Sequence, residues 1–302
     1  MTERYRVGTR RSPLARIQTQ MVLTRLARFA PEARFEPVPV DTSGDRDRTP
    51  GGSPDFTDAI DRALLRGEVD LAVHSAKDLP AELDRRFTLL ACPRRANPRD
   101  CLVVGSPPSG APLGRGARVG SSSPRRRAQL LRWRADLDVV EIRGNVDTRI
   151  GLVRSGTVDA AILAVAGIVR LGRRREIDRV LPLRTFLPAP AQGALAVVSK
   201  TGDASLAATV RRIDHPPTSA CVRAERAFAA ALGGDCHLPL GALASVRAGS
   251  LSLVGEVLAP TGRKSLRRSV DGPASDAGRV GSRLGKELLR RGALELLPSP
   301  SR

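Results

Sequence analysis

The chain has 302 residues, which is too long for one small hydrophobic core and fits two or three domains. Hydrophobic residues make up 41% of it, an ordinary share that excludes global disorder. Lys and Arg number 50 against 31 Asp and Glu, a formal net charge of +19, and nearly all of these basic residues are Arg. Genomic base composition or an anionic partner explains this bias, because the guanidinium group binds planar carboxylates and phosphates through two parallel hydrogen bonds.

Cysteine usage and hydropathy set the expected compartment. The four cysteines form no C-x-x-C pair, so a zinc or thioredoxin-like site has little support, and we expect no bound metal. The N-terminus has no apolar run, and no stretch approaches roughly 18 uninterrupted apolar residues. We therefore expect a cytoplasmic protein with free thiols and no membrane segment.

Short apolar runs alternate with amphipathic stretches along the first part of the chain. We expect strands at Tyr5–Gly8, Arg34–Val40 and Val69–His74, and helices at Ser12–Arg28 and Phe56–Arg66. This alternation predicts an α/β fold.

Two internal similarities run in the same order along the chain. Gly67–Ala72 resembles Gly156–Ala161, and Val7–Pro13 resembles Val119–Pro124. Either these short matches arise by chance, or two related α/β domains face each other across a ligand cleft. We adopt the second interpretation.

The remaining pattern predicts a crossover and a third domain. Pro182–Gln192 is rich in proline and suits a return of the chain to the first domain. Beyond about Pro216 we expect a helix at Ser219–Leu232, strands at Leu240–Val246 and Leu251–Leu258, and a final helix at Ala277–Arg291. That arrangement is a small α+β domain. The predicted domains are 1–98 with the return segment 194–214, 99–193, and 215–302.

Two Ser-Pro turns each follow a strand and precede a helix. Ser12 and Ser123 suit the N-cap, and the prolines after them suit the first helical position. Such helix starts offer free N–H groups and a positive dipole end, which favour anions. Capping alone explains Ser-Pro but not the arginines beside both turns, so we predict anion binding there.

Lys77 and Asp78 follow a predicted buried strand, in a polar loop that Pro80 ends. Strand ends facing a cleft are the usual place for catalytic groups in such folds. A carboxylate beside a Lys, in an Arg-rich cleft, stays ionised and could stabilise a developing cation or pass protons. The alternative is a surface loop with a salt bridge. His74 is predicted to be structural.

Two later loops carry further candidates. Arg143 and Arg149 lie on either side of a Gly-Asn turn, which suits a pair of arginines facing the cleft or an exposed loop. Cys236 closely follows two glycines and is sterically open. Its thiol could be a nucleophile or an attachment point, or simply a small buried group.

Together these motifs resemble those of hydroxymethylbilane synthases (porphobilinogen deaminases), in the family's order and spacing over nearly the whole chain. Thr9–Ala15 resembles the family's first motif, His74–Pro80 its catalytic loop, and Gly234–Gly241 its cofactor-attachment loop. Four further motifs follow the same order: Gly120–Leu130, Arg143–Arg149, Ala164–Gly172 and Leu187–Leu195.

The resemblance implies a transferase with two domains like type II periplasmic binding proteins and a third, smaller domain. It also implies a dipyrromethane cofactor held by a thioether to Cys236. By motif, Asp78 matches the catalytic carboxylate and Lys77 its neighbour. The residues matched to cofactor binding are Arg10, Ser12, Lys77, Ser123, Arg125, Arg126, Arg143, Arg149 and Arg170. Those matched to substrate binding are Arg10, Phe56, Arg143 and Arg149.

The implied reaction joins four porphobilinogen units with loss of ammonia, and water then releases hydroxymethylbilane for tetrapyrrole and haem biosynthesis. Asp78 would stabilise the azafulvene cation through the pyrrole N–H and help remove the surplus proton. Each pyrrole carries two carboxylates, so the growing chain accumulates negative charge. A cleft rich in arginine would compensate that negative charge.

Several positions depart from the family pattern. Charged residues usual around Phe56 are absent, Pro124 stands where Leu is usual, and Ala191 and Asp235 stand where Gly is usual. The positions whose effect stays open are Ser53, Asp55, Asp58, Ala59, Ala191, Val198 and Asp235. They leave as the alternative a divergent paralogue that acts on a related pyrrole or binds tetrapyrrole-like polycarboxylates without turnover.

Two other classes of protein compete with this interpretation. The charge of +19 suggests a nucleic-acid-binding protein, but no helix-turn-helix, zinc finger or RNA-binding aromatic motif occurs. A non-catalytic binding protein would not need Asp78 and Cys236. We therefore expect porphobilinogen as the partner, no nucleic acid, and a monomer.

Overall fold

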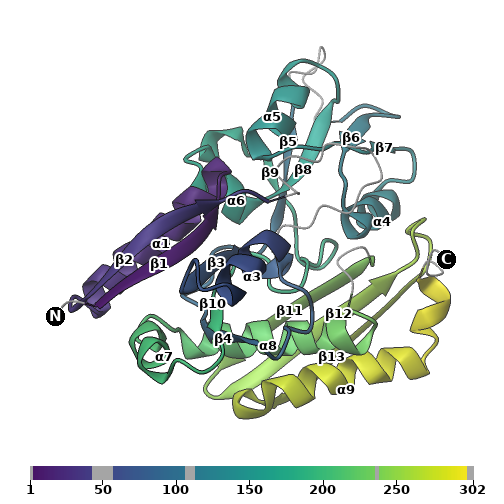
Figure 1. Cartoon of the computed structure of the whole chain (residues 1–302). Helices are drawn as coiled ribbons and strands as arrows, with labels where there is room; N and C mark the ends of the chain where they lie inside the picture. Colours follow the sequence, from purple (N-terminus) through teal and green to yellow (C-terminus); the bar gives the residue numbers. More distant parts are fainter. Residues whose placement is uncertain (1–2, 43–56, 106–112, 235–237, 298–302) are drawn as a thin grey trace.

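The computed structural model describes residues 3–42, 57–105, 113–234 and 238–297. Its strands form two five-stranded sheets and one three-stranded sheet, each with its own helices (Figure 1). We call the unit with the N-terminal sheet domain 1, the unit with the second five-stranded sheet domain 2, and the C-terminal unit domain 3. The predicted α/β class with a small third α+β domain is confirmed.

Domain 1 has a mixed sheet in the order β2-β1-β3-β10-β4. The first three strands are parallel, and β10 runs antiparallel to both of its neighbours. Its strands are β1 (Glu3–Arg10), β2 (Ala33–Val40), β3 (Leu71–Ser75), β4 (Phe87–Ala91) and β10 (Leu195–Lys200). Its helices are α1 (Pro13–Phe29), α3 (Asp58–Leu65), α7 (Ala204–Arg211) and the short 3-10 helix η1 (Ala76–Asp78).

Domain 2 repeats this plan in the order β7-β6-β8-β5-β9, with β5 antiparallel to β8. Its strands are β5 (Asp100–Val104), β6 (Arg118–Gly120), β7 (Asp138–Val140), β8 (Ala160–Ala164) and β9 (Arg179–Val180). Its helices are α4 (Pro124–Trp133), α5 (Val146–Arg154), α6 (Val165–Arg170) and η2 (Arg174–Glu176). The two five-stranded sheets therefore share one strand order.

The internal similarity of the sequence appears as a shared hydrogen-bond arrangement. In domain 1 the Arg6 N–H donates to Asp70 Oδ2 (2.7 Å), and the Asp70 N–H donates to the Arg6 carbonyl (2.8 Å). Arg118 and Asp159 make the same two bonds in domain 2, at 2.6 and 2.9 Å. The repeated Val-Asp motif therefore fixes the entry to β3 and to β8 in the same way, as expected for related domains.

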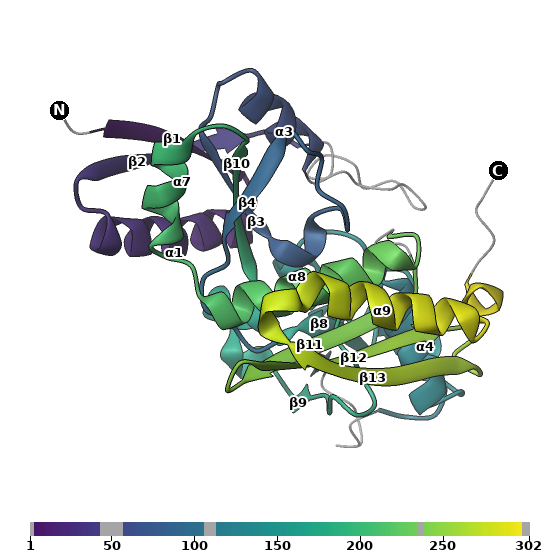
Figure 2. The same ribbon diagram turned by 90° about the horizontal axis from the view of Figure 1, so that it is seen from below.

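Domain 3 packs two helices that run parallel to each other on one face of an antiparallel sheet (Figure 2). Its elements are α8 (Pro216–Ala231), β11 (Leu240–Arg247), β12 (Ser250–Leu258), β13 (Ser265–Pro273), η3 (Ala274–Asp276), α9 (Ala277–Arg290) and η4 (Ala293–Leu296). Phe228 is fully buried in the core between helices and sheet. A Cβ on Gly281 would meet the Ala224 carbonyl at 2.1 Å, so glycine lets α8 and α9 approach closely. The strand β13 was not predicted.

Two segments join domains 1 and 2, and one buried carboxylate of domain 3 binds both. Arg95, in the first segment, donates to Glu225 from Nη1 (2.6 Å) and Nη2 (3.0 Å). The N–H groups of Ala191, in the second segment, and of Ala244 in β11 donate to the same carboxylate (2.6 and 2.7 Å). The predicted Pro182–Gln192 crossover is thus tied to α8 of domain 3.

Two departures from the family pattern now have a structural setting. Ala191 adopts a φ of 60°, a conformation in which glycine avoids the steric penalty of a Cβ. Val198 is fully buried in the core of domain 1, where an apolar side chain packs well. Separately, no helix in the described ranges is long and apolar enough to cross a membrane.

Candidate active site

Asp78 and Lys77 lie on η1, directly after β3. The Ala76 N–H donates to the carbonyl of Ala194 (3.0 Å), which fixes this turn against the start of β10. Ala76 and Leu79 are buried on either side, whereas Lys77 and Asp78 are half-buried. Neither of the two charged side chains makes a hydrogen bond or an ion pair with the residues that the structure describes. Both are therefore available to a ligand.

The burial of Lys77 disfavours the charged form of its side chain. Burial lowers the pKa of its ammonium group to about 8. The carboxylates of Asp78 and Asp100 oppose this shift, whereas Arg126 and Arg125 add to it. The ammonium group of Lys77 in domain 1 therefore interacts electrostatically with charged groups of domain 2.

Both predicted Ser-Pro helix caps are confirmed as caps. Ser12 Oγ accepts the N–H of Ala15 at the start of α1 (3.4 Å), and Pro13 is the first helical residue. Ser123 Oγ accepts the N–H of Arg126 at the start of α4 (3.4 Å). The binding of anions at these turns stays a prediction.

Arg125 and Arg126, which follow the second cap, point into domain 2. Arg125 Nη1 donates to Asp100 Oδ2 (2.8 Å), Gln129 Oε1 (2.9 Å) and the Leu187 carbonyl (2.8 Å). Arg126 donates to Asp100 Oδ1 from Nη2 (2.7 Å) and Nε (3.2 Å). Arg125 Nε is buried without a partner among the described residues. Both arginines thus bind groups of the protein itself, whereas the buried Nε of Arg125 remains without a partner in the described structure.

Arg149 lies on α5 of domain 2, and the charge of Asp78 acts on its pKa. Its Nε donates to the Gly144 carbonyl (2.9 Å) and its Nη2 to Ser122 Oγ (3.1 Å). Burial lowers its pKa to about 10, with the charges of Arg126 and Arg143 acting in the same direction and Asp78 opposing them. These bonds use neutral acceptors, so the guanidinium charge is not neutralised by an ion pair.

Arg143 lies on the same loop but has an acidic partner. Its Nε and Nη2 both bind Glu141 Oε1, at 2.8 and 2.7 Å. Glu141 is exposed, and an exposed pair of this kind contributes little to stability. A ligand carboxylate could therefore replace it at small cost.

Arg10 and Arg170 are the remaining arginines of the predicted site. Arg10 is half-buried at the end of β1. Burial of His74 lowers the pKa of its imidazole to about 4, and the positive charge of Arg10 acts in the same direction. His74 is thus a buried neutral side chain, in line with the structural role predicted for it. Arg170 donates from Nη2 to the Gly193 carbonyl (2.8 Å), and its Nε is buried without a partner in the described part of the chain. Burial and the charge of Arg25 lower its pKa to about 10.

Phe56 and Cys236 lie outside the described residues, so their predicted roles stay predictions. The residue that leads into the Cys236 loop is placed, however. Gly234 follows α8, and a Cβ built on it would stand 3.1 Å from the Cβ of Ala81, three residues after Asp78. The start of the predicted attachment loop therefore lies against the chain that leaves the turn carrying Asp78.

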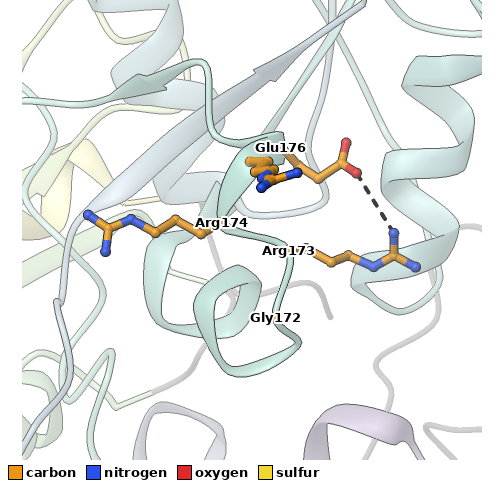
Figure 3. Close-up of a pocket in the computed structure, with 5 residues that line it drawn as sticks. Gly172, Arg173, Arg174 and Glu176 are labelled. Carbon is orange, nitrogen blue, oxygen red and sulfur yellow. Dashed lines mark ion pairs between the residues drawn. The ribbon is translucent and has the colours of Figure 1, made fainter.

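A separate surface hollow of about 690 Å³ lies beyond the end of α6. It is lined by Gly172, Arg173, Arg174, Arg175 and Glu176. Figure 3 shows Arg173 turned toward Glu176 and Arg174 directed the other way. Arg173 is also paired with Asp147 (2.6 Å). None of the predicted site residues lines this hollow, so the chemistry belongs elsewhere.

The residues of the site fit a polycarboxylate. Two arginine Nε donors are buried without partners, at Arg125 and Arg170, and the charge of Arg149 has no ion pair within the described ranges. Buried donors of this kind are costly unless a ligand accepts from them. Carboxylate groups match the guanidinium geometry. A dipyrromethane built from two substrate units, with acetate and propionate side chains, supplies such acceptors.

Fold and site together define an α/β protein with two similar five-stranded domains, in which the charge of Asp78 acts on Lys77 of domain 1 and on Arg149 of domain 2. The family model described as "Porphobilinogen deaminase, dipyromethane cofactor binding domain" matches residues 5–208, and the model for the C-terminal domain matches 219–290. The chain therefore belongs to the porphobilinogen deaminase family of transferases and carries the family's dipyrromethane-binding domain.

Curated relatives agree with this assignment. Porphobilinogen deaminase of Acidothermus cellulolyticus is 44% identical, over 98% of this chain and 91% of the relative. That of Thermus thermophilus is 42% identical, over 96% of this chain and 97% of the relative. Among solved structures, the periplasmic aliphatic sulphonate binding protein SsuA of Escherichia coli is 15% identical with a TM-score of 0.43, covering 76% of this chain and 70% of that protein.

Proposed function

We propose that this porphobilinogen deaminase family member uses Asp78 to drive the deaminative joining of porphobilinogen units, and cations of domains 1 and 2 to hold carboxylates. The observation that carries the proposal is the setting of Asp78. It is half-buried, without a hydrogen bond or ion pair to described residues, and it acts on the charges of both Lys77 and Arg149. A carboxylate kept free among cations is suited to a developing positive charge.

Asp78 has two tasks in this reaction. As the carbon–nitrogen bond of porphobilinogen breaks, positive charge develops on its pyrrole ring, and the fixed carboxylate accepts the ring N–H and stabilises that charge. When the new carbon–carbon bond forms, one proton leaves the attacking carbon. Asp78 takes up this proton and passes it to water, whereas the nitrogen has already left as ammonia from the protonated aminomethyl group when the carbon–nitrogen bond broke. The cofactor, when bound through Cys236, supplies the pyrrole carbon to which the first unit is joined.

The cationic residues have a different task, the binding of acetate and propionate groups. The charge of Asp78 acts on both Lys77 and Arg149, and Arg143 exchanges its exposed partner Glu141 for a ligand. The unpartnered Nε groups support roles for Arg125 and Arg170. We assign the remaining carboxylate contacts by motif to Arg10, Ser12, Ser123 and Arg126, with Phe56 against the substrate.

The organisation around this site is part of the proposal. We assign catalysis to domain 1 (1–98 with 194–214), carboxylate binding to domain 2 (99–193) and cofactor attachment to domain 3 (215–302). We propose that the enzyme acts as a monomer in the cytoplasm on porphobilinogen alone, without nucleic acid. The described residues of the proposed site all belong to one chain, which supports the monomer.

Intact mass and turnover test the proposal together. The purified protein should weigh one dipyrromethane more than its chain, and it should release ammonia from porphobilinogen and form hydroxymethylbilane. Cys236→Ser should lose the added mass and the turnover. Cys221→Ser is the control, because Cys221 is buried in the core of domain 3. Added mass that persists in Cys236→Ser, or a loaded protein that leaves porphobilinogen unchanged, would reject the proposal.

A further inference from the structure

A buried carboxylate that no sequence motif singled out lies behind the site. Asp100 is the first residue of β5 and is fully buried. It accepts four hydrogen bonds: from Arg125 Nη1 (2.8 Å), Arg126 Nη2 (2.7 Å), Arg126 Nε (3.2 Å) and Gln192 Nε2 (2.9 Å). The two guanidinium groups hold the pKa of this carboxyl well below its usual range, although burial acts in the opposite direction. Asp100 is therefore a permanent negative charge.

The two arginines that Asp100 binds are consecutive residues in the first turn of α4. Two like charges side by side, at the positive end of a helix and away from water, repel each other. A single carboxylate that reaches both offsets this repulsion and fixes both side chains on one side. It neutralises only one of the two charges, and it leaves Arg125 Nε without a partner in the described structure.

The influence of Asp100 extends to domain 1. Lys77 is next to Asp78 on η1, and its charge responds to Asp78 on its own turn, to Arg125 and Arg126 on α4, and to Asp100 on β5. Lys77 makes no hydrogen bond or ion pair with these or other described residues. Asp100 of domain 2 thus favours the ammonium form of Lys77.

We propose that Asp100 is a positioning residue of this enzyme. By binding one edge of Arg125 and of Arg126, it orients the free edge of Arg125 toward ligand carboxylates. The negative charge of Asp100 also favours the ammonium form of Lys77. This inference rests on the proposed function for the identity of the ligand, a polycarboxylate pyrrole chain. It goes beyond that function because Asp100 contacts neither ligand nor reacting atoms.

The test compares two buried carboxylates that bind arginines of the same helix. Glu256 of β12 is almost fully buried (1%) and binds Arg132 of α4 at 2.5 Å, on the side that faces domain 3. It is not among the groups that act on Lys77. Glu256 also accepts a hydrogen bond from Gln129 Nε2 (3.4 Å) and acts on the charge of Arg125, but it makes no direct bond to Arg125 or Arg126 in the described structure. Glu256→Gln therefore removes a buried ion pair of α4 without breaking a bond to these two arginines, and it serves as the matched control for Asp100→Asn.

The first readout is the titration of Lys77, followed by NMR of 13Cε-labelled lysine. The chain has only four lysines, Lys77, Lys200, Lys264 and Lys286, so Lys77→Met assigns the signal. Asp100→Asn should move the Lys77 midpoint down, because the ammonium group loses the favourable charge of Asp100. Glu256→Gln should leave it in place. The protein is used as purified, with its cofactor content determined by mass.

The second readout concerns binding. Asp100→Asn should lower the fraction of chains that carry the cofactor and raise KM for porphobilinogen more than it lowers kcat, whereas Glu256→Gln should change only the melting temperature. Equal behaviour of the two variants would overturn the proposal and leave Asp100 a purely structural residue. If the parent protein turns over no porphobilinogen, the proposed function fails, but the Lys77 titration still decides the role of Asp100.

A third variant covers the case in which Asp100→Asn does not fold. Arg125→Gln leaves the Asp100 bonds to Arg126 in place and removes a positive charge that acts on Lys77. The Lys77 midpoint should then move upward, opposite to the shift in Asp100→Asn. An unchanged or lower midpoint in Arg125→Gln would contradict the electrostatic link on which the proposal depends.

Discussion

Gly234, at the end of α8, lies directly against Ala81, three residues beyond Asp78. A Cβ on Gly234 would stand 3.1 Å from the Cβ of Ala81, and the φ of Gly234 is +62°. This contact joins domain 3, at the entrance to the Cys236 loop, to the turn of domain 1 that carries the proposed catalytic carboxylate. The position of the cofactor relative to Asp78 should therefore depend on it.

Gly234→Ala should impair both cofactor loading and turnover. The added methyl group forces the two segments apart, and the left-handed backbone costs about 1–2 kcal/mol for a residue with a Cβ. Gly233→Ala is the control, because Gly233 also has a positive φ (+95°) but nothing lies within 4 Å of the added Cβ. Added mass, turnover and melting temperature are measured for each.

The double variant Gly234→Ala with Ala81→Gly distinguishes contact from strain. Removing the methyl group of Ala81 restores the space, so loading and turnover should recover in part while the backbone strain remains. If Gly233→Ala and Gly234→Ala lose activity equally, and Ala81→Gly rescues nothing, the contact does not position the cofactor.

Arg149 and Arg126 should respond differently to replacement by Gln. Arg149 binds only neutral acceptors, so Arg149→Gln should change the melting temperature little and lower kcat/KM on the order of 10²-fold, the cost of a lost charge-assisted pair to ligand. Arg126→Gln breaks a buried ion pair with Asp100, which should cost about 3–5 kcal/mol of stability. Thermal unfolding and steady-state kinetics of the two variants check this.

Arg86→Gln is a suitable control for Arg149, since Arg86 is an exposed arginine paired with Asp84 far from the site in the fold of domain 1. Arg86→Gln should change neither the melting temperature nor kcat/KM noticeably. A large loss of stability in Arg149→Gln with normal kcat/KM would show that Arg149 serves the fold rather than the ligand.

The lowered pKa of Lys77 predicts a pH-dependent stability. With a folded-state pKa of about 8, below the ordinary 10.5, the folded protein loses this proton before the unfolded chain does. Stability contributed by this group therefore rises between about pH 8 and pH 10.5, with a slope of at most about 1.4 kcal/mol per pH unit. Below pH 8 the cost of burying the charge is fully present.

Lys77→Met removes this cost. In the cofactor-free Cys236→Ser background, Lys77→Met should be the more stable protein at pH 7, and the gap should close between pH 8 and 10.5. Chemical unfolding of both proteins at several pH values measures it. A gap that stays constant over this range would mean that Lys77 titrates like an exposed lysine.

Local chemistry made much of the site predictable from the sequence. The caps at Ser12 and Ser123 follow from the Ser-Pro pairs, and both lie where expected. The Val-Asp motif marks the start of β3 and of β8, because its Asp binds the neighbouring strand through the same backbone groups in both domains. Element ends differ from expectation by at most three residues, as at α8, which begins at Pro216 rather than Ser219.

Long-range partners could not be predicted in this way. Asp100 and Glu225 each collect donors from segments far apart in the chain, and neither lies in a motif whose spacing points to such a role. The antiparallel entry of β10 between β3 and β4 likewise depends on the return of the chain after Gln192. Strand β13 has a largely exposed, charged sequence, so it lacks the apolar alternation that indicates a strand.

The central claim is that the fixed negative charge of Asp78 stabilises a developing cation. Asp78→Asn and Asp78→Glu test it most directly, because Asn keeps the shape and loses the charge, whereas Glu keeps the charge and moves it by about one methylene group. Loss of one such stabilising group typically costs on the order of 10²–10³ in rate. Single-turnover rates are compared on protein shown by mass to carry the cofactor.

Asp78→Glu should retain measurable turnover of porphobilinogen, and Asp78→Asn should retain almost none, with equal cofactor content in both. Equal rates for the two loaded variants would contradict the account, because charge would then not be the contribution of Asp78.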